Sequence, residues 1–403
     1  MAPGGHTARS HAPATPDGAV DVVRPEPAPT GRIRAHYESW KPVYWAFALS
    51  RLLVFVVGFA ADAAMRITGQ DPATWRPFAF AETYPHYADV VTNGYTLQNA
   101  YDYPVLPGLM AAGDVVGIPL WLTAFVLANA CFLVGLLGLA MLGERYVGKL
   151  ASVRGATYLA IAPFAYWFSI ASTESLLLAL AVGSVLLALR ATPGAWLGAG
   201  TLAALAALTR PPGALVGLLL LCIAISQLRA RKLGVRGTFA ALAAGMMIPA
   251  AIAAFFAFLK GETGDALAAI HAQDQFNRHV TLDGPIKALE SGVRNTLAAS
   301  PGQAIELVAT IGAAALIVWF AARAAGDRWE LRGWTLFGAA SLLLPLATGV
   351  LWQMPRFALL IPPVFWMLGM LGTERRWLHR AVLVLFPLAL AIKVATSVVG
   401  VAG

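Results

Sequence analysis

The chain has 403 residues, of which 58 % are hydrophobic and only 12 % are charged. Soluble domains carry about 25 % charged residues, so this composition excludes an ordinary soluble fold and indicates many membrane-spanning helices. The formal net charge of +8 does not point to nucleic acid, because membrane proteins collect Lys and Arg in their cytoplasmic loops. We therefore expect membrane lipids, and no nucleic acid, among the partners.

Residues 1–41 precede the hydrophobic part of the chain. They are rich in Pro, Gly, Ala and Thr and contain no apolar stretch long enough for a signal peptide. We expect a disordered cytoplasmic tail over 1–41 and a single integral-membrane domain over 42–403. Cys131 and Cys222 both lie in apolar runs, so the sequence predicts neither a disulfide nor a cysteine metal site.

Eleven apolar runs of about 15 to 24 residues follow, which suits a hydrocarbon core about 30 Å thick at about 1.5 Å per helical residue. They cover 43–64, 119–142, 156–170, 174–190, 194–208, 213–228, 237–259, 303–323, 333–351, 357–372 and 381–400. The predicted fold class is an all-α polytopic membrane protein of about eleven transmembrane helices.

Clusters of basic residues give the orientation, because Lys and Arg in short loops stay on the cytoplasmic side. Such clusters precede the first run and follow the second, sixth, eighth and tenth runs. This pattern predicts a multi-pass protein of the cell membrane with a cytoplasmic N-terminus. It places the two long polar loops, 65–118 and 260–302, on the extracytoplasmic face, where their acids, amides, histidines and aromatic residues could form a site.

The loop segment "NGYTLQNAYDYPVLPGLM" (93–110) resembles a segment of the PIG-V-like mannosyltransferases. Five further stretches resemble this family in order and spacing: "ALSRLLVF" (48–55), "PFAYWFSIASTESLLL" (163–178), "LTRPPGALVGLLLL" (208–221), "TGDALAAIHAQDQFNRHV" (263–280) and "WQMPRFALLIPPVF" (352–365). The resemblance extends from about residue 43 to 372. It implies a membrane glycosyltransferase fold of the GT-C class, and transfer of a mannosyl (hexosyl) residue from a polyprenyl-phosphate sugar to an acceptor hydroxyl, without a cofactor.

The chain departs from this family at the expected catalytic base. The family carries an aspartate in "WD..WY..IA..GY", whereas the matching stretch here is "AETYPHYADVVTNGY" (81–95). An ungapped match puts Thr83 at the aspartate position, and a one-residue gap puts Glu82 there. The base therefore stays open between Glu82 and Asp89.

The chemistry of this reaction selects the other candidates. A lipid-phosphate donor has no nucleotide, so neither a Rossmann fold nor a phosphate-binding glycine loop is needed, and the sequence shows neither. The departing phosphate is best bound by the planar fork of arginine; we expect Arg210, Arg356 and Arg278 to bind it. Further polar and aromatic side chains of the outer face are expected to contact the substrates: His86, Tyr101, Asp102, Tyr103, Glu174, His271, Gln273 and Gln275.

Several of these residues have simpler interpretations. Arg210 could extend its charge to the membrane interface, and Glu174 could be an ordinary acid at a helix start. Arg51, deep in the first run, is expected to be structural, because it lies in the cytoplasmic half. The loop "HAQDQFNRH" (271–279) could be merely solvated. It has His271 and Asp274 one helical turn apart but no second compact pair of ligands, so we expect no metal.

The segment 101–110 combines Asp102 and two tyrosines with Pro104 and Pro107. The prolines should stop an incoming helix, and tyrosines suit the membrane interface. We expect a short helix over 105–118, ahead of the second span. The rival functions are a lipid-linked transporter or flippase, which would place polar groups near the bilayer midplane, and a membrane scaffold without activity.

Overall fold

The computed structural model describes residues 29–68, 84–276, 278–298, 300–323 and 328–399. All regular secondary structure in these residues is helical. The chain divides into two units, Met1–Ser39 and Trp40–Gly403, and the candidate site lies within the second. Glu82 and Thr83 fall outside the described residues.

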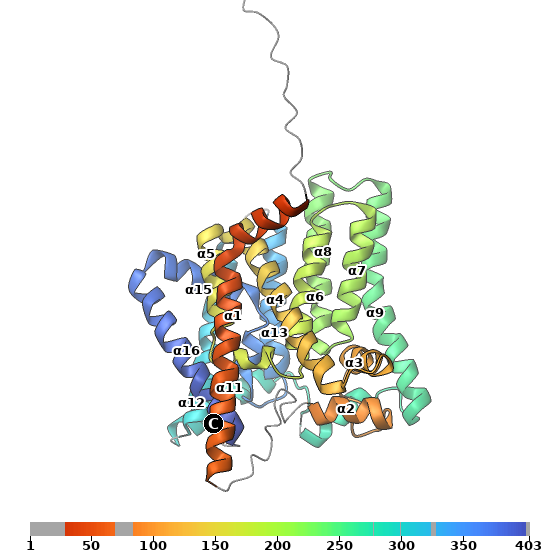
Figure 1. Ribbon diagram of the computed structural model, residues 1–403. Coiled ribbons are helices and arrows are strands. Elements are labelled where there is room, and N and C mark those ends of the chain that lie inside the picture. The colour runs from red at the N-terminus through yellow and green to blue at the C-terminus, as the bar shows by residue number, and fades with distance from the viewer. Residues whose placement is uncertain (1–28, 69–83, 277, 299, 324–327, 400–403) are drawn as a thin grey trace, which may run out of the picture. The chain divides into compact units, whose positions relative to one another are not determined.

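Figure 1 shows the order of the helices along the chain. The α-helices are α1 (Pro29–Ile67), α2 (Tyr84–Asn93), α3 (Val105–Val115), α4 (Leu120–Val147), α5 (Lys149–Ala160), α6 (Glu174–Ala188), α7 (Pro193–Ala207), α8 (Val216–Arg229), α9 (Val235–Thr263), α10 (Ala268–His271), α11 (Gly284–Leu297), α12 (Pro301–Arg323), α13 (Trp329–Leu346), α14 (Met354–Ala358), α15 (Pro362–Glu374) and α16 (Arg376–Val399). Three short 3₁₀ helices are η1 (Ala165–Phe168), η2 (Pro211–Leu215) and η3 (Ala272–Phe276). The expected short helix before the second span is confirmed as α3, whereas α1 begins at Pro29, inside the segment predicted to be a disordered tail.

Six helical segments of the described chain are long and apolar enough to cross a membrane: His36–Ile67, Leu120–Val147, Pro211–Arg229, Val235–Thr263, Pro301–Arg323 and Arg376–Val398. The all-α membrane fold class is thus confirmed, but the predicted number of about eleven spans is not. Helices α6 and α7 have 15 residues each, which gives a length of only about 22 Å.

Two of the predicted spans are interrupted. The run 156–170 contains the end of α5 at Ala160 and the separate helix η1, because Pro163 cannot continue a helix. The run 357–372 is split between α14 and α15, the second of which starts at Pro362 and Pro363. Hydropathy detects these apolar runs, but the prolines divide them.

Small residues allow the helices to approach closely. A Cβ at Gly155 of α5 would overlap the carbonyl oxygen of Phe365 in α15, and a Cβ at Gly369 of α15 would overlap that of Ala151. Such contacts between small residues are typical of helix interfaces in membranes. Aromatic residues fill the interior between helices, as in the edge-to-face pair of Trp334 and Trp366, whose centroids are 5.0 Å apart.

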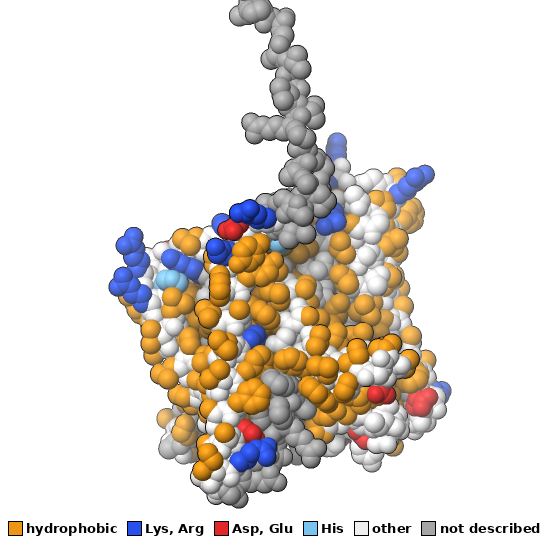
Figure 2. All heavy atoms as spheres, in the orientation of Figure 1, with side chains coloured by type: hydrophobic (Ala, Val, Ile, Leu, Met, Phe, Trp, Pro, Cys, Tyr) orange, Lys and Arg blue, Asp and Glu red, His pale blue; other side chains and the backbone are white. Residues whose placement is uncertain are grey.

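The two ends of the bundle differ in their polar groups. At one end, Arg145 of α4 forms an ion pair with Glu330 of α13 at 2.9 Å, and Arg154 donates to the carbonyl of Gly372 at 2.7 Å. Lys and Arg side chains gather near the turn between α15 and α16 in Figure 2. The basic segments that follow the second, eighth and tenth runs therefore lie together at one end, and the side of the membrane on which they lie stays a prediction.

The two long polar loops meet at the other end. Gln275 donates to the carbonyl of Gln98 at 2.9 Å, and the N–H of Val105 donates to the carbonyl of Leu208 at 3.2 Å. The N–H of Thr281 likewise donates to the carbonyl of Ala347, at 2.8 Å. Residues of both loops are thus brought against the turns that follow α7 and α13.

Candidate active site

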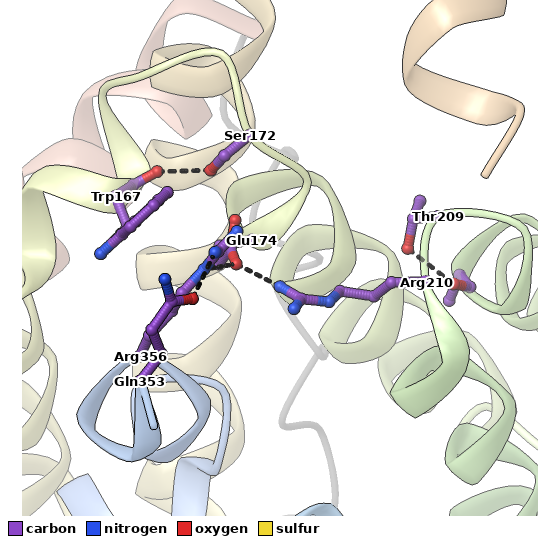
Figure 3. Close-up of polar contacts among 8 residues, drawn as sticks. Trp167, Ser172, Glu174, Thr209, Arg210, Gln353 and Arg356 are labelled. Carbon is purple, nitrogen blue, oxygen red and sulfur yellow. Dashed lines mark hydrogen bonds and ion pairs between the residues drawn. The ribbon is translucent and has the colours of Figure 1, made fainter. Parts of the chain in front are cut away.

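A buried carboxylate binds two arginines at this end of the bundle. Glu174, the first residue of α6, is 0 % exposed. Nη1 of Arg210 and Nε of Arg356 both donate to its Oε1 (Figure 3). The two arginine side chains are 15 % and 11 % exposed. One buried negative charge therefore faces two positive charges.

Local sequence explains how Arg210 reaches this position. It follows α7 and precedes Pro211 and Pro212, and its φ of −173° and ψ of 160° are those of extended backbone. A residue before proline is biased toward this conformation. A Cβ at Gly213 would overlap the carbonyl oxygen of Ala206, so only glycine allows the chain to turn back so tightly. The "RPPG" sequence thus follows the end of α7, keeps the backbone of Arg210 extended and begins the next helix, η2.

Arg356 is held on the opposite side by a short helix. It belongs to α14, and its Nη1 donates to Oε1 of Gln353 at 2.9 Å. Its guanidinium carbon lies 3.7 Å from the ring centroid of Trp167 in η1, which is a favourable cation–π distance. The carbonyl of Trp167 accepts a 2.7 Å hydrogen bond from Ser172, in the turn that leads to Glu174.

Arg278 adds a third positive charge. Its guanidinium carbon lies 5.0 Å from the ring of Trp352 and 5.3 Å from that of Phe276. Among the residues that the structure describes, no carboxylate forms an ion pair with it. Burial, and then the positive charges of Arg356 and Arg210, lower the pKa of the Arg278 guanidinium. These three predicted phosphate ligands therefore lie near enough to repel one another, and an anion between them would relieve this repulsion.

Asp102 is a second buried acid of the same end. It is 6 % exposed, and its Oδ2 has no hydrogen-bond partner among the described residues. Burial, followed by the negative charge of Asp89, raises the pKa of Asp102 to about 7. A carboxyl with such a pKa can exchange a proton near neutrality.

Asp89, one of the two expected bases, is differently placed. It lies in α2 and accepts hydrogen bonds from the side-chain amides of Asn93 at 2.7 Å and Asn99 at 2.8 Å. These bonds lower the pKa of Asp89. Its geometry is that of a carboxylate that fixes the loop after α2. Glu82, the other expected base, stays a prediction.

Tyr87 is a buried residue within electrostatic range of the acids and the arginines. This buried residue of α2 packs in a cluster with Ala171 and Leu176, which flank Glu174 in sequence. Burial, and then the charges of Asp102 and Glu174, raise the pKa of the Tyr87 hydroxyl, and the positive charges of Arg356 and Arg210 oppose that rise.

The remaining predicted residues lie around this centre or outside it. His86 shares a 2.9 Å hydrogen bond with the hydroxyl of Tyr101, whose ring is 5.1 Å from Phe276. Tyr103 is buried and packs on Phe255 at 5.3 Å. Gln275 bridges the two polar loops, and Gln273 is half-buried. His271 is exposed and pairs with Asp265 at 2.6 Å.

Arg51 makes the contacts of a structural residue. Its guanidinium donates to the carbonyls of Ala160 at 3.1 Å and Ala165 at 3.0 Å and to the hydroxyl of Ser169 at 2.5 Å. It thereby satisfies backbone groups that are left free between α5 and α6, where η1 interrupts the predicted span.

Sequence reasoning missed Glu306, Gln353, Trp167 and Tyr87. Glu306 had a usable signal, because it is an acid at the start of the apolar run 303–323, and intramembrane charges usually have a specific partner. The other three had no such signal. The described residues contain no group of three or more His, Cys, Asp or Glu that could hold a metal ion.

No protein-family model matches the chain, and no curated protein matches it. Among solved structures, it is similar to ArnT from Cupriavidus metallidurans bound to undecaprenyl phosphate, with 14 % identity, a TM-score of 0.49, and coverage of 86 % of this chain and 61 % of that one. It is also similar to the oligosaccharyltransferase of Archaeoglobus fulgidus in the apo form, with 11 % identity, a TM-score of 0.48, and coverage of 89 % and 56 %. A further structure of the archaeal enzyme, AglB with an inhibitory peptide and a dolichol-phosphate, gives 12 % identity, a TM-score of 0.45, and coverage of 90 % and 56 %.

The chain thus spans little more than half of the length of these structures.

Proposed function

We propose that this protein is a membrane glycosyltransferase that uses a polyprenyl-phosphate sugar. The observation that carries the proposal is the sharing of one oxygen of Glu174 by Arg210 and Arg356, with Arg278 beside them. The cluster has an excess of positive charge, is largely buried, and lies at the ends of helices too short to span a bilayer. These properties suit the phosphate of a lipid whose tail stays in the membrane.

The proposed reaction is a direct displacement at the anomeric carbon. The acceptor oxygen forms a bond to the anomeric carbon, and the bond between this carbon and the phosphate oxygen breaks. The polyprenyl phosphate then leaves as an anion bound by the arginines. The acceptor's proton passes to a carboxylate. A single base and a direct displacement imply inversion at the anomeric carbon.

Among the described carboxyl groups of the first polar loop, Asp102 suits the role of the base best. It is buried and lacks a partner for Oδ2, whereas both oxygens of Asp89 accept hydrogen bonds from amides. Glu82 is the rival base that the sequence resemblance supports. The choice of mannose and the PIG-V-like family rest on that resemblance alone, and the acceptor is identified only as a hydroxyl compound.

The test uses the full chain purified in detergent. Polyprenyl-phosphate mannose, labelled in the lipid, is incubated with the protein and with membrane and secreted fractions as acceptor sources, and released polyprenyl phosphate is measured. We expect release by the wild type and a loss of about 10-fold or more for Arg210→Ala and Arg356→Ala. Arg294→Ala is the matched control, because Arg294 is an exposed arginine paired with Glu290 on α11.

Two results would contradict the proposal. Movement of the labelled lipid between leaflets of proteoliposomes, without release of polyprenyl phosphate, would support a flippase. Absence of both release and lipid binding would support a scaffold.

A further inference from the structure

The backbone before Arg356 is held in an unusual conformation. Gln353, the residue before α14, has a φ of 58° and a ψ of 22°. This left-handed region costs a residue other than glycine about 1 kcal/mol or more. A non-glycine residue that adopts it must be held by its surroundings.

Glu306 of α12 provides that restraint. Its Oε1 accepts the N–H of Gln353 at 3.0 Å, and its Oε2 accepts the N–H of Met354 at 2.6 Å. The first N–H groups of a helix have no partner within the helix, Pro355 has no N–H, and no side-chain cap is present at Gln353. A carboxylate 47 residues away in sequence therefore satisfies the donors at the start of α14.

The position of Glu306 makes this arrangement costly to keep. It lies in a helix that is long and apolar enough to span the membrane, where an acid is expensive and usually has a specific role. Lys393 of α16 interacts with it electrostatically and attractively, which offsets part of that cost. Both carboxylate oxygens are used by the backbone of one turn.

The side chain of Gln353 also orients Arg356. Oε1 of Gln353 accepts Nη1 of Arg356, and Nε of Arg356 donates to Glu174. Two edges of the guanidinium are thus fixed, while Trp167 covers one face. The direction in which Arg356 meets a phosphate depends on the conformation of Gln353, and this conformation depends on Glu306.

We propose that Glu306 is a positioning residue, which acts through Gln353 to set the geometry of Arg356 for a lipid phosphate. The role of Arg356 rests on the proposed function, whereas the restraint on the turn does not. Glu306→Gln tests both parts, because it replaces one of the two accepting oxygens with an NH₂ group, which cannot accept a hydrogen bond from the backbone.

The first measurement is amide hydrogen exchange of the wild type and of Glu306→Gln. We expect the peptide that contains Gln353 and Met354 to exchange about 10-fold faster in the variant, with other peptides unchanged. Glu290→Gln, which removes an exposed carboxylate of α11, is the control and should leave this peptide unaffected. Equal exchange in the wild type and Glu306→Gln would overturn the restraint itself.

The second measurement is binding of radiolabelled polyprenyl phosphate in a double-mutant cycle with Arg356→Ala. We expect Glu306→Gln to weaken lipid binding about 10-fold when Arg356 is present. In the Arg356→Ala background it should have little further effect, because the two residues act through one contact. Additive losses would overturn the positioning role. Failure of the wild type to bind this lipid would instead overturn the proposed function, and the exchange result would still decide whether Glu306 restrains the turn.

Discussion

Arg210 and Arg356 donate to the same oxygen of Glu174, Oε1, and its Oε2 has no hydrogen-bond partner among the described residues. Arg210 approaches from the extended turn after α7 and Arg356 from α14, and each uses one nitrogen for this carboxylate. Glu174 is thus a counter-ion that brings two cations together without neutralising both. A phosphate could be bound by the remaining donors while the carboxylate stays in place.

Glu174→Gln should destabilise the protein and change its response to the donor lipid. Removal of one partner from a buried ionic cluster leaves uncompensated charge, with a typical cost of about 3–5 kcal/mol. We expect a lower Tm in detergent, and a larger rise of Tm on addition of polyprenyl phosphate than in the wild type, because the anion replaces the lost charge. Differential scanning fluorimetry measures both; an unchanged Tm would show that Glu174 is not needed to keep the arginines together.

Arg210→Lys should impair the enzyme although it keeps the positive charge. Lysine lacks the planar fork that can donate to Glu174 and to a phosphate at the same time. Loss of a charge-assisted hydrogen bond of about 1.5–3 kcal/mol corresponds to a fall in kcat/KM of about 10- to 100-fold. Steady-state release of polyprenyl phosphate at varied donor concentration measures this; wild-type kinetics in both Arg210→Lys and Arg210→Ala would remove this residue from the site.

Asp102 predicts a pH dependence of stability. Its pKa is raised to about 7 in the folded protein, against about 3.9 for an unperturbed aspartate. The folded state therefore binds the proton of Asp102 more tightly than the unfolded state does. The protonated carboxyl contributes to the free energy of unfolding below about pH 4, and this contribution is lost as the pH rises to about 7. We expect the free energy of unfolding in urea to fall less between pH 5 and pH 8 in Asp102→Asn than in the wild type. The same pH dependence in both proteins would contradict the raised pKa of Asp102.

Asp102 also predicts the pH dependence of the reaction. If it is the base, kcat/KM should increase with pH up to about 7 and then level off, because only the ionised carboxylate accepts a proton. With Asp89 the increase would end below about pH 4, since hydrogen bonds lower the pKa of that group. The variants Asp102→Asn, Asp89→Asn and Glu82→Gln separate the candidates, and a base contributes about 10²–10⁴-fold to the rate. A wild-type rate in Asp102→Asn together with an inactive Glu82→Gln would assign the base to Glu82.

The predicted topology has a direct test. A cysteine at Asp283, in the second polar loop, should react with an impermeant maleimide in intact cells, because this side chain is 56 % exposed. A cysteine at the exposed Arg231, between α8 and α9, should react only after permeabilisation. Cys131 and Cys222 are replaced by serine in both variants to remove background. The reverse pattern would place the candidate site on the cytoplasmic side.

The sequence predicted the membrane class and helix α3, because hydropathy and prolines are local signals. It also singled out Arg210 and Arg356, whose role as phosphate ligands stays a prediction. It assigned Glu174, Arg210 and Arg356 to one site but did not predict that Glu174 forms ion pairs with both arginines, since these pairs join residues 36 and 182 positions apart and depend on helix packing. It also missed α11, whose exposed apolar residues Ile286, Val293 and Leu297 repeat at helical spacing within a loop otherwise interpreted as polar. The role of Glu306 is equally non-local, because its partners are main-chain groups of another helix.

The short helices α6 and α7 determine how deep the arginine cluster lies in the membrane. The turn between them carries the exposed Arg190, which suits a polar membrane surface. From that surface, helices of 15 residues reach about 22 Å into a hydrocarbon core about 30 Å thick. If Arg190 marks that surface and the helices run along the membrane normal, Glu174 and Arg210, at their far ends, would lie several ångströms below the opposite headgroup layer. Under the proposed function, the lipid phosphate would then approach the protein within the bilayer, and the acceptor, rather than the donor, would cross the boundary with water.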